Sequence, residues 1–74
     1  MFGLGKKRSK FGKWIDKRGI SQQWVAAKSG VNRNTVGKIA SDPDYIPTGT
    51  TIKKILSAVR AVDKSVRAED FWSM

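Results

Sequence analysis

Gly30 stands between two short stretches that suit α-helices, and it leaves almost no room for a loop between them. The first stretch follows Ser21 and runs to about Ser29, because the Ser21 hydroxyl can accept a hydrogen bond from an unpaired N–H of the first turn. The second covers about residues 33–40, with Asn32 as its cap. Helices joined this closely must pack at a steep angle, and glycine can take the positive φ that such a joint requires. We therefore expect a sharp turn at this residue.

Helical spacing continues on both sides of this pair. Ser9 is expected to cap a first helix that ends at Gly19. A longer helix is expected from Thr50 or Thr51, and a short last helix around residues 68–72. The apolar faces of the first and the longer helix are expected to hold Phe11, Trp14 and Ile15, and then Ile52, Ile55, Leu56, Val59 and Val62. Because no segment alternates with period two, the sequence predicts an all-α fold, a compact bundle of about five short helices.

The size and composition of the chain argue for one domain and against an enzyme. Its 74 residues allow a single core, so residues 9–74 are expected to form one domain after a flexible basic arm at residues 1–8. Neither cysteine nor histidine occurs, so the usual zinc ligands and the usual near-neutral general base are missing. No apolar run approaches the roughly 20 residues that span a bilayer. We expect a cytoplasmic protein that has no cofactor, no metal and no catalytic activity.

Positive charge is concentrated in the first half of the chain. The chain has fifteen Lys and Arg residues and six Asp and Glu residues, for a net charge of +9. Residues 1–41 contain ten of the basic residues and one acid, whereas residues 42–74 contain five of each sign. Such an excess favours a polyanion as partner, with nucleic acid ahead of an acidic membrane. The alternative is a solvated basic surface that only maintains solubility.

The joint and its flanking residues resemble a known family. Their spacing is similar to the helix-turn-helix of phage-repressor and Cro-type proteins, also called XRE-like regulators, at Gln22, Ala26, Gly30, Val31, Val36 and Ile39. The loop with Pro47 and the Thr-capped helix after it resemble the family's fourth helix, and the ending resembles small regulators of Gram-positive mobile elements. The resemblance covers nearly the whole chain. It implies a lambda-repressor-like DNA-binding domain that acts as a transcriptional regulator, more often a repressor, at the nucleoid.

The resemblance makes the helix after Asn32 the recognition helix. A helix of about eight residues fits the major groove of B-DNA, which is about 12 Å wide. Its outward face is expected to carry Arg33, Asn34 and Lys38 as base-contacting residues, with Gly37 allowing a close approach. Arginine and lysine can donate to guanine O6 and N7, and asparagine can pair with adenine N6 and N7. Lys38 suits a phosphate contact equally well.

Other polar residues are expected to contact the DNA backbone. The resemblance implies that Gln22 binds a phosphate, and this side chain could also brace one on the recognition helix. Short polar groups and helix-start lysines suit phosphates as well; the full expected backbone set is Gln22, Asn32, Thr35, Lys53 and Lys54. A basic arm that follows the backbone or enters the minor groove is expected at Lys6, Lys7, Arg8 and Lys10. The alternatives are a plain helix cap for Asn32, a solvated face for the two lysines, and a solubilising tail for the arm.

Partners other than DNA follow from what one domain can achieve. A single recognition helix reads about three or four base pairs, so a homodimer on double-stranded DNA is expected. Val66 and Phe71 are expected to pack the last helix on the body, and Trp72 beside them is a candidate dimer contact. Trp24 is expected to cover the side of the first helix, with a protein contact as the alternative. The alternative function is an antitoxin or an antirepressor-type interaction module on the same fold. No small-molecule ligand is indicated.

Overall fold

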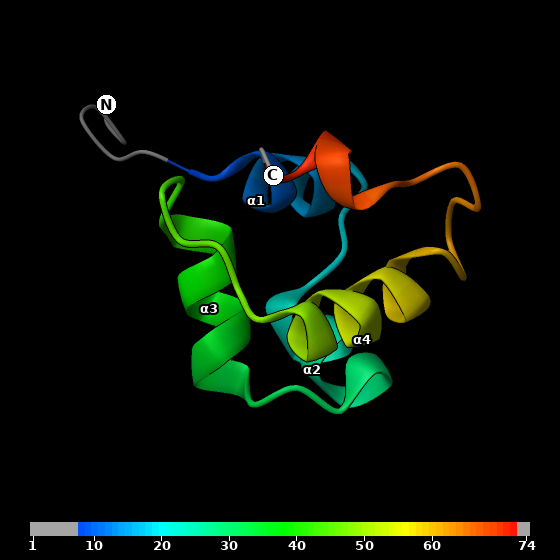
Figure 1. Ribbon diagram of the computed structural model, residues 1–74. Helices are drawn as coiled ribbons and strands as arrows, with labels where there is room; N and C mark the ends of the chain where they lie inside the picture. The colour runs from blue at the N-terminus through cyan, green and yellow to red at the C-terminus, as the bar shows by residue number, and fades with distance from the viewer. Residues whose placement is uncertain (1–7, 73–74) are drawn as a thin grey trace.

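The computed structural model describes residues 8–72, which form four α-helices and one short 3₁₀ helix. The order is α1 (Lys10–Lys17), α2 (Gln22–Ser29), α3 (Arg33–Ser41), α4 (Gly49–Val59) and the 3₁₀ helix η1 (Ala68–Asp70). Figure 1 shows α2 and α4 beside each other, α3 at one side of the molecule, and α1 near η1 at the opposite end from α2. No strand occurs within the described residues. The all-α prediction is confirmed, with four α-helices instead of about five.

Each α-helix begins at a polar side chain that accepts a backbone N–H. Ser9 accepts from Gly12 at 2.9 Å, and Ser21 accepts from Trp24 at 2.9 Å. Asn32 caps α3 as predicted, with its Oδ1 2.7 Å from the backbone nitrogen of Asn34. These three caps confirm the predicted starts of α1, α2 and α3.

The predicted start of α4 is wrong by one or two residues. Thr48, and not Thr50 or Thr51, is extended at φ −64° and ψ 160°, and its hydroxyl accepts from the backbone nitrogen of Thr51 at 3.3 Å. Because the Thr48 hydroxyl caps the first turn, the helix begins at the next residue, Gly49. The lysines of α4 consequently lie in its second turn.

All four helices contribute to one core. Val36 and Ile39 of α3 are fully buried with Val25 of α2. The predicted stripe of α4 is confirmed from Ile52 to Val59. Val62 is a wrong prediction, because 48% of it is exposed. The helix ends at Val59, whose carbonyl accepts from the nitrogen of Val62, so helical spacing no longer decides where this side chain points.

Aromatic side chains attach the C-terminal segment to α1. The Phe71 ring packs edge-on against Phe11, at 5.2 Å between centroids, and against Trp14, at 5.8 Å. Trp72 stacks on Phe11 at 6.2 Å and is only 3% exposed. The expected return of Val66 and Phe71 to the body is confirmed. Trp72 is core and offers little surface to a partner.

A single backbone carbonyl joins the start of α1 to the end of α3. Ala40 accepts hydrogen bonds from both the backbone nitrogen and the hydroxyl of Ser9, each at 3.0 Å. Gly12 lies against the same carbonyl, and a Cβ at this position would overlap the Ala40 oxygen. The two helices can approach this closely only because Gly12 has no side chain.

Gly12→Ala is therefore expected to lower the free energy of unfolding by about 1–3 kcal/mol, since the backbone of α3 must shift to admit a methyl group. Urea unfolding followed by circular dichroism measures the change. Gly49→Ala is the matched control, because a Cβ there meets nothing within 4 Å. It should leave stability within about 0.5 kcal/mol or slightly raised. Equal effects of the two substitutions would contradict the close approach of α1 and α3.

Candidate nucleic-acid interface

The joint between α2 and α3 has the geometry that the sequence predicts. Gly30 has φ 77°, in the left-handed region, and its nitrogen donates to the carbonyl of Ala26 at 2.9 Å. The Ser29 hydroxyl accepts from the backbone nitrogen of Val31 at 3.1 Å. Ala26 and Val31 are half-buried and pack against the core. The chain thus turns directly from α2 into α3.

One face of α3 is buried and the other is open. Val36, Ile39 and Ala40 point into the core, whereas the three residues predicted to contact bases are all exposed. These are Arg33, Asn34 and Lys38. Positions three and four apart share one side of a helix, so four residues form a continuous outward strip, namely Arg33, Asn34, Gly37 and Lys38. The structure therefore brings the predicted base-contacting residues to one solvent-facing surface.

Gln22, at the start of α2, lies against this strip. Its side-chain Oε1 is 3.3 Å from the place that a Cβ of Gly37 would occupy. The side chain is half-buried, so part of it stays accessible. Because Gly37 has no side chain, the Gln22 amide has room to lie beside the outward strip.

The other predicted backbone-contacting residues occupy two places. Asn32 and Thr35 flank the first turn of α3, where Asn32 serves as the helix cap. Lys53 and Lys54 are exposed on α4, but in its second turn and not at its N-terminus. The prediction that these lysines stand at the start of α4, where the helix N-terminus would help to bind a phosphate, is therefore wrong. Their side chains are nevertheless exposed to solvent.

The described part of the basic arm lies on the folded body. Arg8 makes a two-pronged ion pair with Asp16, with nitrogen–oxygen distances of 2.9 and 3.1 Å. Lys10 is the first residue of α1 and is exposed. Lys6 and Lys7 lie outside the described residues. Two of the five N–H donors of the Arg8 guanidinium are thus used by Asp16.

Two residues near the end of α3 belong to the same surface and were not predicted. The ammonium of Lys38 lies 4.7 Å from the centroid of the Tyr45 ring, a cation–π distance. Ser41 is exposed one turn beyond Lys38, as the last residue of α3. Its spacing from Lys38 could have placed it on the outward face. Nothing in the sequence indicated that Tyr45 would fold back from the loop onto Lys38.

This arrangement defines a DNA-binding helix-turn-helix protein. A helix-turn-helix family model matches residues 13–63, from α1 to just beyond α4. The chain belongs to the XRE-type helix-turn-helix family, whose members are DNA-binding regulators and typically not enzymes. Neither the curated proteins nor the solved structures gave a significant match. Among the described residues, no helix has the length and apolar character needed to cross a bilayer.

Gly37→Ala tests how firmly Gln22 is held beside α3. Alanine favours a helix by about 1 kcal/mol over glycine, and the only neighbour in its way is the far end of a flexible side chain. We expect the unfolding free energy to rise by about 0.5–1 kcal/mol, measured by thermal and urea unfolding. A loss of stability would mean that the Gln22 amide is fixed in place and cannot move aside.

Proposed function

We propose that this chain is a transcriptional repressor that binds its operator as a homodimer, with α3 in the major groove of each half-site. The observation that carries the proposal is the outward strip of α3, where a guanidinium, a carboxamide and an ammonium group are all exposed. These are the groups that read base edges in a major groove. A repressor of this kind would act at the nucleoid, in the cytoplasm, by occupying an operator and so blocking the polymerase.

Each residue of the strip has a role in this proposal. Arg33 donates to guanine O6 and N7, and Asn34 makes the paired contact with adenine N6 and N7. Lys38 lies towards the end of α3 beside Tyr45 and contacts a guanine or a phosphate there.

The backbone contacts surround this strip. Gln22, Asn32 and Thr35 lie at the first turns of α2 and α3, where short polar groups suit phosphate oxygens. Lys53 and Lys54 approach from α4. The basic residues before and at the start of α1 supply further phosphate contacts, with Arg8 using the donors that Asp16 leaves free; they are Lys6, Lys7, Arg8 and Lys10.

A second candidate function rests on an exposed tryptophan. Trp24 is 37% exposed on α2 and lines a shallow hollow of about 390 Å³ with Ile20 and Val62. Exposed apolar patches often mark protein contacts. An antitoxin or antirepressor would bind its target protein here while keeping the same fold. This function predicts that Trp24→Ser abolishes the protein contact and leaves DNA binding unchanged.

In vitro selection from random duplexes tests the proposed function. We expect a palindromic consensus with half-sites about 10 base pairs apart, since two recognition helices related by a two-fold axis lie one turn of DNA apart. Recovery of duplexes with no enriched sequence would contradict the repressor and favour the interaction module.

Two substitutions on the selected duplex separate base reading from phosphate binding. Arg33→Ala should cost about 1–3 kcal/mol of binding and relax the preference at one base pair. Lys54→Ala should weaken all sequences about equally and reduce the slope of log K against log salt by about 0.9. Fluorescence anisotropy at several salt concentrations measures both.

Lys64→Ala is the matched control, because this exposed lysine lies in the turn after α4 and its loss changes the net charge equally. It should leave sequence preference and salt slope unchanged. A change of sequence preference in Lys54→Ala would contradict its assignment to a phosphate.

A further inference from the structure

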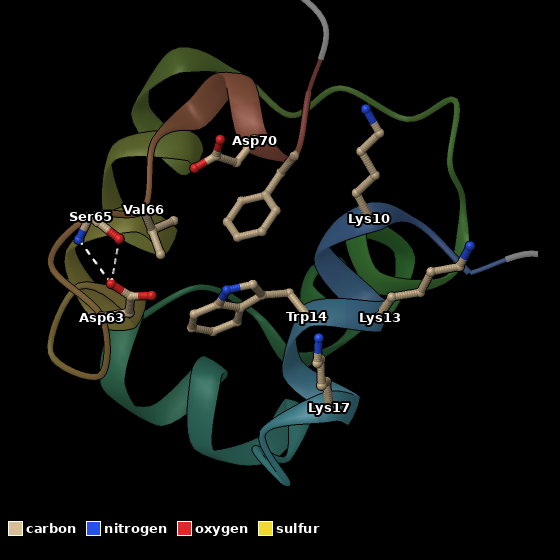
Figure 2. Close-up of a pocket in the computed structure, with 9 residues that line it drawn as sticks. Lys10, Lys13, Trp14, Lys17, Asp63, Ser65, Val66 and Asp70 are labelled. Atoms are coloured by element: carbon tan, nitrogen blue, oxygen red, sulfur yellow. Dashed lines mark hydrogen bonds between the residues drawn. The ribbon is translucent and has the colours of Figure 1, made fainter.

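An open groove of about 380 Å³ runs between α1 and the segment of residues 63–71. Figure 2 shows its lining side chains, with α1 on one side and the C-terminal segment on the other. Trp14, Val66 and Phe71 supply an apolar lining. No residue of α2, α3 or α4 lines it, so a partner seated here would leave the recognition strip of α3 uncovered.

The two edges of the groove carry opposite charges. The α1 edge holds Lys10, Lys13 and Lys17, which share one helical face at steps of three and four. The opposite edge holds Asp63 and Asp70. In Figure 2, Asp70 lies across the groove from Lys10 at one end, while Asp63 and Lys17 lie towards the other. The charge pattern is therefore antisymmetric about the groove's long axis.

Most of these charges are not neutralised within residues 8–72. The two ion pairs within residues 8–72 are Arg8–Asp16 and Arg18–Asp63, so the three lysines and Asp70 take no part in one. Asp70 accepts a hydrogen bond from the backbone nitrogen of Arg67 at 2.9 Å and stays exposed.

The Asp63 carboxylate already has more hydrogen-bond and ion-pair partners within residues 8–72 than the Asp70 carboxylate. Hydrogen bonds from the side chain and backbone of Ser65 hold the pKa of the Asp63 carboxyl below its usual range, and the Arg18 charge lowers it further. The Arg18 guanidinium also stacks on the Trp14 ring at 4.2 Å. The free charges that can attract a partner are therefore the lysines on one edge and Asp70 on the other.

We propose that this groove is the surface through which two copies of the chain dimerise, with the two-fold axis running along the groove. A two-fold axis that lies in the interface and runs along the groove places each edge of one copy against the opposite edge of the other. The lysine edge of each copy then faces the acidic edge of its partner, and the apolar linings meet between them. In this dimer Lys10 pairs with the partner copy, which leaves Lys6, Lys7 and Arg8 for the DNA phosphates. This inference rests on the proposed function, in which two copies bind one operator.

The exposed apolar surface around Trp24 fits a copy of this chain less well. The hollow around Trp24 and Val62 has no charged side chain in its lining, so nothing there opposes the repulsion between two chains of net charge +9. The groove beside α1 provides attraction at both edges in a symmetric pair. Charge complementarity thus favours the groove as the dimer surface.

Mixing two charge-reversal variants tests the antisymmetric pairing directly. Lys10→Glu makes both edges acidic at one end, and Asp70→Lys makes both edges basic there. Each variant alone should dimerise at least roughly tenfold more weakly than the original chain, because like charges then face each other twice per dimer. An equimolar mixture should recover the dimer, since both contacts of a heterodimer pair opposite charges. Sedimentation equilibrium without DNA measures all three samples.

The variants are chosen so that the fold survives. A glutamate at the first residue of α1 suits the positive end of the helix dipole. Asp70→Lys loses the bond to Arg67, and circular dichroism shows whether it remains folded. If Asp70→Lys unfolds, Lys10→Glu and the original chain alone still give three dimers whose strengths can be compared. The original homodimer should be tightest, the mixed dimer intermediate and the Lys10→Glu homodimer weakest. Trp24→Ser is the control at the other surface and should dimerise like the original chain.

Three results would overturn the proposal: an original chain that stays monomeric at the highest soluble concentration, single variants that dimerise normally, or a mixture that remains monomeric. Loss of the dimer in Trp24→Ser would assign the interface to the other surface. Because no DNA is present, failure here leaves the selected operator and the base contacts intact. Conversely, a failed duplex selection leaves the dimer groove intact.

Discussion

The fold depends on the carbonyl group of Ala40, near the end of α3. The last carbonyls of a helix have no partner within it, and this one is satisfied by the nitrogen and the hydroxyl of Ser9. The same serine caps α1, so one residue binds the end of one helix and starts another. Gly12 lets the two backbones approach there. With its C-terminal end held against α1, α3 presents its remaining outward side to solvent.

The opposite end of α3 is held by local geometry. Gly30 turns the chain in the left-handed region, and Asn32 caps the helix two residues later. Between these two attachments, Val36 and Ile39 enter a core that all four helices share. The outward strip is the side of α3 that this core does not use.

Most features that depend on neighbouring residues could be predicted from the sequence, although the start of α4 at Thr48 was not, and the close contacts between particular distant residues could not be predicted. The caps at Ser9, Ser21 and Asn32 and the turn at Gly30 each involve groups a few residues apart, and all four are confirmed. The exposure of Arg33 and Asn34 follows from helical spacing around Val36. By contrast, the close approach at Ala40 and the ion pair of Arg8 join residues whose proximity only tertiary packing decides. The same holds for the Tyr45 ring beside Lys38, and Val62 was misplaced because the end of α4 carries no glycine or proline signal.

Nuclear magnetic resonance shows directly whether the outward strip of α3 faces DNA. Amide resonances of the ¹⁵N-labelled chain would be followed while a selected duplex is added. If the strip faces DNA, the largest shifts should fall on residues 32–41 and on Gln22, with smaller shifts on α4. Shifts concentrated on α1 and residues 63–71, with α3 unperturbed, would contradict it.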